Sequence, residues 1–336
     1  MPAVSDIIRP ARRSAAALSA AGALALTLTS CGGNAADAAI AVSGSSTVAP
    51  ITEAVARAGG FTVDVAAEGT LDGFTRFCNG DTAINNASVA IPGAGQPENF
   101  VAMCEENGVE FIELPVALDA LSIVRNERNT FALDMTLDEL RAIWSPDSEI
   151  RTWQDVRAEW PDRAISRYGR PPGSGTFDYF THFVVGETGS ITSDYRSTDD
   201  MGELSAWIAN DDDALAFMGV GNYLAADEDH RDRMTNVAVD GVLPALENAR
   251  DGQYRPLTRP LFLYVSTAAL GDDDKLGEFL SYYLAHAADV VPRVYFYPLA
   301  PEAYRLAQER FDQRITGTAF DGDPYSEQSV LEVLGS

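Results

Sequence analysis

Residues 165–180 read Ile-Ser-Arg-Tyr-Gly-Arg-Pro-Pro-Gly-Ser-Gly-Thr-Phe-Asp-Tyr-Phe. This segment predicts a strand end, a turn of small residues and a helix start. The helix is indicated by Phe177, Phe180 and Val184, whose spacing places them on one helical face. Thr176 precedes this face, so we expect its hydroxyl to cap the first turn. Free N–H groups at a helix start, with the Arg170 guanidinium nearby, suit a small tetrahedral oxyanion. The alternative is an ordinary capped helix beside a surface arginine.

The composition limits the possible partners. The chain has 336 residues and a formal net charge of −26. Nucleic acid is disfavoured as a partner because phosphate backbones need many lysines and arginines. Long-range attraction of an anion is also unfavourable, so an anion site must depend on local donors. Lys275 is the single lysine in the sequence, which leaves arginines as the cations for such a site. The length predicts about two domains of ordinary size.

Residues 1–30 have the features of an export signal. Three arginines precede an apolar run over residues 15–28, which is too short to span a bilayer. The run ends in Leu-Thr-Ser-Cys-Gly, which resembles the lipobox of bacterial lipoproteins. That resemblance implies cleavage before Cys31, lipidation of its sulfur and anchoring on the extracytoplasmic side of the cell membrane. Residues 31–39 are then a linker. A plain secretory signal with a chance cysteine is the alternative.

Two cysteines remain, Cys78 and Cys104. In an exported protein an even number of remaining cysteines predicts a disulfide. A metal role is disfavoured because the chain has no Cys-x-x-Cys pair and no histidine near these residues. We therefore expect neither a metal nor a cofactor.

The strand, small-residue turn and helix start occur in two earlier segments as well. A strand over residues 38–43 runs into Gly-Ser-Ser-Thr, and a strand over residues 61–65 leads to Gly-Thr-Leu-Asp-Gly. In an open parallel sheet such turns gather at the carboxyl ends of the strands, where ligands bind. We therefore expect an α/β fold in which three helix starts face one cleft.

Two extended stretches predict passages between domains. Residues 109–124 form a nearly continuous apolar run that is too long for an ordinary strand. They predict either two strands or a crossover from one domain to the other. Residues 254–265 contain two prolines that exclude a helix, and they predict the return crossover.

Six motifs carry a likeness to a known family: Gly44-Ser-Ser-Thr-Val-Ala-Pro50, Glu68-Gly-Thr-Leu-Asp-Gly-Phe74, Phe77-Cys-Asn-Gly80, Asn86-Ala-Ser88, Gly173-Ser-Gly-Thr176 and Arg259-Pro-Leu-Phe-Leu-Tyr264. They resemble the substrate-binding lipoprotein of ABC-type phosphate uptake systems, in the family's order and over about residues 40–300. The resemblance implies an α/β, two-lobed periplasmic-binding-protein-like fold with a ligand cleft between the lobes. Lobe 1 would comprise residues 40–115 and 260–336, and lobe 2 residues 116–259.

The same resemblance implies a function without catalysis. The protein would be a monomer that binds inorganic phosphate or a similar oxyanion and delivers it to the permease subunits of an ABC transporter. The residues that it implies as hydrogen-bond donors come from the three turns: Thr47 and the Val48 amide, then Thr70, then Arg170, Ser174, Gly175 and Thr176.

Two positions depart from the family pattern. Ala83 stands where the family usually has Asp, and Val89 where it usually has Arg. In the family that Asp accepts the proton of hydrogen phosphate, and a carboxylate repels fully ionised sulfate. We therefore expect weaker discrimination between phosphate and sulfate, or another preferred oxyanion. Asp72 and Glu68 are the alternative acceptors.

The sequence leaves one alternative function open and disfavours two classes of enzyme. An altered-specificity paralogue, or an anion sensor or surface interaction protein without a transport role, is the main alternative. A serine hydrolase is disfavoured because there is no Gly-x-Ser-x-Gly motif and His182 is too close in sequence to Ser174. Nucleotide hydrolysis is disfavoured because no Gly-x-x-x-x-Gly-Lys motif occurs.

Overall fold

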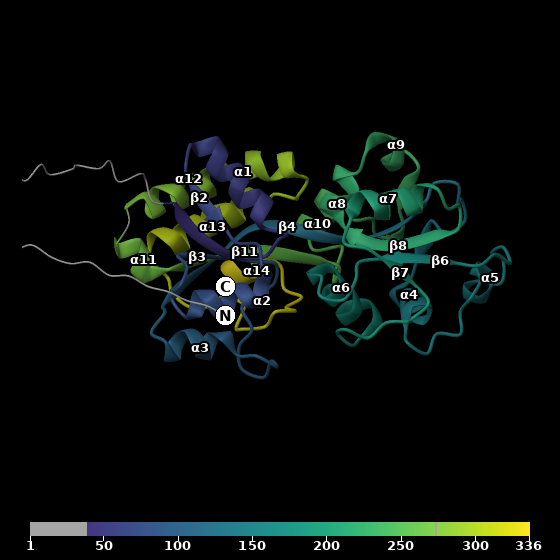
Figure 1. Ribbon diagram of the computed structural model, residues 1–336, viewed down its shortest axis with the longest axis horizontal. Helices are drawn as coiled ribbons and strands as arrows, with labels where there is room; N and C mark the ends of the chain where they lie inside the picture. Colours follow the sequence, from purple (N-terminus) through teal and green to yellow (C-terminus); the bar gives the residue numbers. More distant parts are fainter. Residues whose placement is uncertain (1–38, 273) are drawn as a thin grey trace, which may run out of the picture. The chain divides into compact units, whose positions relative to one another are not determined.

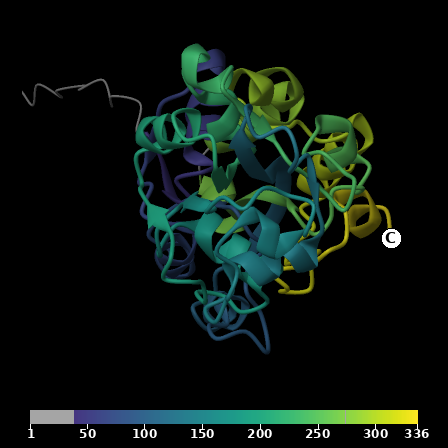
Figure 2. The ribbon, with the colours of Figure 1, turned by 90° about the vertical axis from the view of Figure 1, so that its right-hand side faces the viewer.

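The computed structural model describes residues 39–272 and 274–336. The predicted signal segment, the predicted lipidation site Cys31 and nearly all of the predicted linker lie outside the described residues. The described chain forms two α/β lobes connected by two long antiparallel strands, β4 (Phe111–Asn126) and β11 (Thr258–Ser266) (Figure 1). Figure 2 views the molecule from the second lobe, whose teal and green segments lie in front.

The sheet of the first lobe has the strand order β2-β1-β3-β11-β4. Strands β1 (Ile40–Gly44), β2 (Val63–Val65) and β3 (Ile84–Ala87) are parallel to one another, and β11 is antiparallel to β3 and β4. The parallel strands therefore end at one edge of the sheet, which includes β1 and β2, the strands that precede two of the three predicted turns.

Strand β4 continues from the first lobe into the second. There it pairs with β8 (Ala214–Gly219) and β9 (Met234–Asn236), and the sheet goes on through β6 (Ser166–Gly169) to β7 (Arg196–Ser197). All 16 residues of β4 are buried. The prediction of two strands is thus wrong, and the alternative of a crossover is confirmed. One strand can be this long because successive parts of it pair with different neighbours. A separate two-stranded sheet joins β5 (Asp134–Met135) to β10 (Ala238–Val239).

Helices cover both parts of the sheet. In the first lobe these are α1 (Ala49–Gly59), α2 (Thr70–Cys78), α3 (Phe100–Glu106), α11 (Thr267–Asp272), α12 (Asp274–Val290), the 3-10 helix η2 (Val291–Val294), α13 (Pro301–Asp312) and α14 (Val330–Leu334). In the second lobe they are α4 (Leu137–Trp144), α5 (Trp153–Val156), α6 (Gly175–Phe180), the π-helix η1 (Thr181–Val185), α7 (Met201–Ala209), α8 (Val220–Ala225), α9 (Glu228–Arg231) and α10 (Leu246–Arg250).

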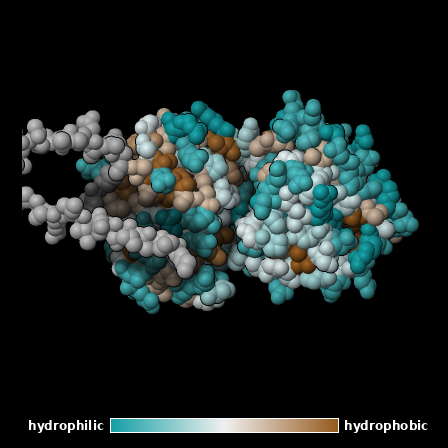
Figure 3. Space-filling view, viewed as in Figure 1, coloured by the Kyte–Doolittle hydropathy of each residue, from teal (hydrophilic) through white to brown (hydrophobic). Residues whose placement is uncertain are grey.

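Each lobe has its own hydrophobic core. In the first lobe the Phe74 and Tyr264 rings pack edge to face, with centroids 4.8 Å apart. In the second lobe Phe180 stacks on Phe217 at 3.9 Å, and Trp144 packs against the edges of both. Figure 3 shows a mostly hydrophilic face with hydrophobic residues in separate groups. Among the described residues, no helix is long and apolar enough to cross a membrane.

A buried carboxylate holds the C-terminal segment on strand β4. Glu113 accepts hydrogen bonds from the Tyr264 hydroxyl at 2.7 Å, the Thr318 hydroxyl at 3.0 Å and the Ala319 N–H at 2.7 Å. Burial raises the pKa of Glu113, while these hydrogen bonds lower it. The three donors satisfy a group that would otherwise be costly to bury, and two of them tie residues 318–319 to the first lobe.

The predicted disulfide is confirmed. Cys78, at the end of α2, and Cys104, in α3, are joined with an S–S distance of 1.98 Å. Both cysteines are buried in the first core. The bond therefore connects two helices that flank the same side of the parallel strands.

Replacing both cysteines by alanine should lower the free energy of unfolding by about 3 kcal/mol, because the unfolded chain regains the freedom of the closed loop. Guanidinium chloride unfolding followed by circular dichroism measures this change. A reducing agent should weaken the natural protein to a similar extent and leave the double variant unchanged. Equal midpoints for the two proteins under oxidising conditions would contradict the prediction.

Candidate functional site

The first loop of the site depends on a glycine at the end of β1. Gly44 has a φ of +108°, and a Cβ added there would lie 2.1 Å from the Asn86 carbonyl oxygen. Only glycine permits this close approach. The Ser45 N–H then donates to the same carbonyl at 2.8 Å, and the Thr47 N–H donates to the Ser45 hydroxyl at 3.1 Å. Residues 45–47 are thus fixed before α1 begins.

The second loop is held against the first. A Cβ added to Gly73 would lie 2.3 Å from the Gly44 Cα, so the start of α2 packs directly on the end of β1. Thr70 lies in the first turn of α2. Its hydroxyl oxygen is 3.1 Å from the Ser88 hydroxyl and accepts from the Ser88 N–H at 3.2 Å. Thr70 and Ser88 therefore present a pair of hydroxyl groups at the ends of neighbouring segments.

The third loop leads into α6, and its cap differs from the predicted one. The Ser174 hydroxyl accepts from the Thr176 N–H at 3.3 Å, while Thr176 itself is buried in the helix. The prediction that Thr176 caps the helix is wrong because the helical backbone begins at Gly175, directly after the extended Ser174. The predicted apolar face is confirmed, since Phe177, Phe180 and Val184 are all buried.

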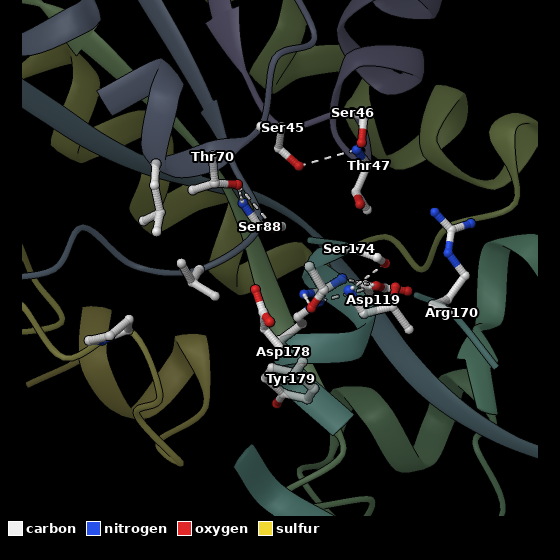
Figure 4. Close-up of a pocket in the computed structure, with 18 of the residues that line it drawn as sticks. Ser45, Ser46, Thr47, Thr70, Ser88, Asp119, Arg170, Ser174, Asp178 and Tyr179 are labelled. Carbon is white, nitrogen blue, oxygen red and sulfur yellow. Dashed lines mark hydrogen bonds and ion pairs between the residues drawn. The ribbon is translucent and has the colours of Figure 1, made fainter. Parts of the chain in front are cut away.

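The three loops face one cleft with a volume of about 1620 Å³ (Figure 4). A Cβ added to Gly175 would lie 3.5 Å from the Ser88 hydroxyl oxygen, so the two lobes come close here. Six of the seven predicted binding residues line the cleft: Thr47, Thr70, Arg170, Ser174, Gly175 and Thr176. The seventh, Val48, is buried behind the lining, and its N–H donates to the Ser45 carbonyl at 3.2 Å.

Arg170 stands at the edge of this donor set. Its Nη2 contacts a carboxylate oxygen of Asp199 at 2.9 Å, and its Nη1 lies 3.0 Å from the Met201 sulfur. Within residues 39–272 and 274–336 its buried Nε has no hydrogen-bond partner. Burial lowers the pKa of Arg170 and the charge of Asp199 opposes this, but a guanidinium stays protonated in proteins. Arg170 therefore brings positive charge and an unused donor.

A buried ion pair lies beneath the third loop. Arg259 of β11 is directly opposite Asp119 of β4, and its Nε and Nη2 donate to one Asp119 oxygen at 3.1 and 2.9 Å. Its Nη1 donates to the Gly175 carbonyl at 3.2 Å. The side chains are only 5% and 4% exposed. The pair connects both crossover strands to the start of α6, and sequence reasoning did not assign it to the site.

The position of Ala83 corrects the interpretation of the missing acceptor. Ala83 directly precedes β3, and its N–H donates to the Ala41 carbonyl at 3.1 Å. It is not among the residues that line the cleft, whereas Val89, beyond the other end of β3, is. The prediction that Ala83 removes an acceptor from the site is therefore wrong, because the residue lies at the amino end of a strand whose carboxyl end faces the ligand loops.

The two alternative acceptors do line the cleft. Asp72 is exposed on α2. Glu68 contacts the Arg76 guanidinium at 3.2 Å, and this arginine partly neutralises its negative charge. Within the described parts of the chain, histidine, cysteine and acidic residues form no group that could hold a metal ion.

Comparison with known proteins identifies the superfamily to which this chain belongs. Residues 29–286 match the model of the PBP superfamily domain. The chain belongs to the PBP superfamily. The chain is similar to the protein SphX of Synechocystis sp. and to the phosphate-binding protein PstS of Staphylococcus saprophyticus. The first is 36% identical over 88% of each chain, and the second is 27% identical over 81% of this chain and 84% of its own.

Similar solved structures support the two-lobed fold. A possible phosphate binding protein from Planctomyces limnophilus is 33% identical, with a TM-score of 0.66 over 83% of this chain and 99% of its own. A putative phosphate ABC transporter substrate-binding protein from Clostridium perfringens, solved with bound phosphate, is 21% identical. Its TM-score is 0.60 over 78% of this chain and all of its own. At that identity the second likeness supports the fold alone.

Proposed function

We propose that this protein binds inorganic phosphate in the cleft and delivers it to the permease of an ABC transporter. The observation that carries the proposal is the convergence of three donor-rich loops and Arg170 on one cleft. Hydroxyl groups, backbone N–H groups and a guanidinium are the donors that a tetrahedral oxyanion needs. The relatives named for phosphate binding support the choice of ligand.

The proposed ligands are Thr47, Thr70, Ser174, Gly175, Thr176 and Arg170. We add Ser88 to them, because its hydroxyl lies between Thr70 and the start of α6. The Val48 N–H already donates to the Ser45 carbonyl. We therefore propose the Val48 amide as a ligand only in a rearranged first loop.

Binding is proposed to close the lobes about β4 and β11. The open cleft is far larger than one phosphate ion, so donors on both sides must approach each other to surround it. Hinge closure around a ligand is the usual behaviour of two-lobed binding proteins. We place the lobe boundaries near residues 115–116 and 259–260. The separate hydrophobic cores support the second boundary, because Leu257 and Leu261 belong to different cores, and they extend the first lobe along β4 to Leu118.

The remaining features follow from this role. The PBP superfamily is a family of solute-binding proteins, and we propose that this member catalyses no reaction. We also propose export, lipidation at Cys31, and action as a monomer beside its permease. These proposals rest on the N-terminal sequence and on the resemblance to uptake receptors.

Isothermal titration calorimetry of the purified protein with phosphate and with sulfate tests the ligand. We expect saturable one-to-one binding of phosphate and clearly weaker binding of sulfate. Equal or stronger sulfate binding would favour a paralogue of altered specificity. Absence of heat with either anion, confirmed by unchanged thermal stability in their presence, would reject the proposed function.

A further inference from the structure

The loop that precedes α14 is fixed to the first lobe. Phe320 at its start and Val330 at its end are both buried in the first hydrophobic core. Between them, the Gly322 carbonyl accepts from the Gly93 N–H at 2.8 Å, and a Cβ added to Gly93 would lie 2.9 Å from the Gly322 Cα. Residues 320–330, here called the C-terminal loop, therefore lie directly on the first lobe and belong to it.

One residue of the C-terminal loop packs on the second lobe instead. The Tyr325 ring is stacked on the His182 imidazole, with ring centroids 3.7 Å apart and planes 9° from parallel. It also packs edge to face on the Phe183 ring at 5.9 Å. Tyr325 is half-buried against the hydrophobic core of the second lobe, and all three rings line the cleft. The loop thus connects the lobes at a place separate from β4 and β11.

Both sides of this contact are ordered by the fold. The Tyr325 N–H donates to a carboxylate oxygen of Asp323 at 3.0 Å, which fixes the turn that carries the ring. His182 and Phe183 lie in η1, a π-helix that continues α6 without a break. Single π-helical turns are rare and are frequent at functional sites. Residues 174–176, which are proposed to bind the anion, lie at the start of the same continuous helix. The contact therefore joins the first lobe to the helix that carries the donors of the second.

We propose that the stack of Tyr325 on His182 is a latch that limits the opening of the lobes and keeps their donors within reach of one anion. A rotation that parts the lobes must separate the two rings, because the C-terminal loop is fixed to the first lobe and η1 to the second. One aromatic pair contributes a modest free energy, so the latch can break and form again. Apparent affinity falls with the fraction of molecules in the binding-competent arrangement. The latch therefore strengthens anion binding without touching the anion.

Small-angle X-ray scattering of the purified protein without phosphate measures the opening. Tyr325→Ala should have a larger radius of gyration than the natural protein, and saturating phosphate should abolish the difference. In calorimetric titration the same variant should bind phosphate about two- to tenfold more weakly, as expected for the loss of one aromatic pair. Tyr325→Phe keeps the ring and should match the natural protein in both measurements. The titration rests on the proposed function, whereas the scattering without phosphate does not.

Tyr282→Ala is the matched control. Tyr282 is also stacked on a histidine, His286, with ring centroids 3.9 Å apart, but both residues lie in α12 of the first lobe. Its removal deletes a similar stack that does not join the lobes. The radius of gyration should therefore stay unchanged, and the phosphate affinity should stay within about twofold of the natural protein.

An unchanged radius of gyration in ligand-free Tyr325→Ala would overturn the inference. A radius that stays enlarged with saturating phosphate would also overturn it, because it would indicate damage to the loop and not opening of the lobes. A larger radius with unchanged phosphate affinity would overturn the effect on binding. If circular dichroism shows that Tyr325→Ala is unfolded, His182→Ala, which removes the other ring, decides the question by the same measurements. If the natural protein binds no phosphate, the proposed function fails, and the ligand-free scattering still decides whether the latch exists.

Discussion

Arg170→Ala is expected to weaken phosphate binding by about 2–5 kcal/mol, which is roughly 30-fold to several thousandfold, and to leave the fold intact. Arg170 supplies a guanidinium whose Nε is buried and without a partner in the described part of the chain. Its partner Asp199 is 75% exposed, so water replaces that contact readily when the guanidinium is removed. The loss therefore falls on the ligand and not on the stability of the second lobe.

Calorimetric titration with phosphate measures the effect, and Arg128→Ala is its matched control. Arg128 is also an arginine of the second lobe that pairs with an exposed aspartate, Asp212, but it does not line the cleft. Both variants change the net charge equally, so a difference between them reports local contacts and not the field of the whole protein. Phosphate affinity of Arg170→Ala within twofold of the natural protein would remove Arg170 from the site.

The parts of the site that the sequence predicts are those determined by neighbouring residues. Gly44 and Gly73 stand in short motifs that can be recognised in the sequence. Both positions need glycine because the end of β1 and the start of α2 pack without side chains between them. Phe177, Phe180 and Val184 reveal α6 and η1 because burial on one face needs helical spacing. Such constraints act over a few residues and can be recognised in the chain itself.

The parts that the sequence does not predict depend on contacts between distant segments. Arg259 meets Asp119 because β11 and β4 are antiparallel in one register, and no local pattern gives that register. Whether Ala83 or Val89 faces the cleft depends on which end of β3 carries the ligand loops. The choice of Ser174 over Thr176 as the cap is a shift of two residues in the helix start, which is within the usual uncertainty of helix boundaries.

Strand β4 is longer than the strand length that the sequence alone would predict, and its tertiary contacts explain the difference. A run of 16 apolar and polar residues exceeds an ordinary strand, and its first half pairs with β11 while its second half pairs with β8 and β9. Two of its buried acidic residues have partners in the fold: Glu113 holds residues 318–319 and Asp119 holds Arg259. Each part of the strand thus has pairing partners in its own lobe, and the strand runs from one lobe into the other without a break.

Arg259→Leu is expected to lower the free energy of unfolding by about 3–5 kcal/mol, because it leaves Asp119 buried without its cation. Asp119 already has one buried oxygen without a partner in the described structure, so no second donor is at hand to compensate. The same substitution removes the donor that holds the Gly175 carbonyl, and phosphate affinity should fall as the start of α6 loses its support.

Urea unfolding of a double-mutant cycle distinguishes the cost of an unpaired charge from a simple loss of packing. If the orphaned Asp119 carboxylate causes the damage, Asp119→Leu/Arg259→Leu should be more stable than Arg259→Leu, because a buried pair replaced by apolar side chains often costs little. Arg305→Leu is the control: Arg305 pairs with Glu302 on the exposed face of α13, where both side chains are at least 50% exposed, and its loss should cost less than about 1 kcal/mol. A double variant weaker than Arg259→Leu would contradict the argument. In that case Arg259 would stabilise the hinge through its stacking over the Tyr179 ring and its bond to Gly175, and not through neutralising Asp119.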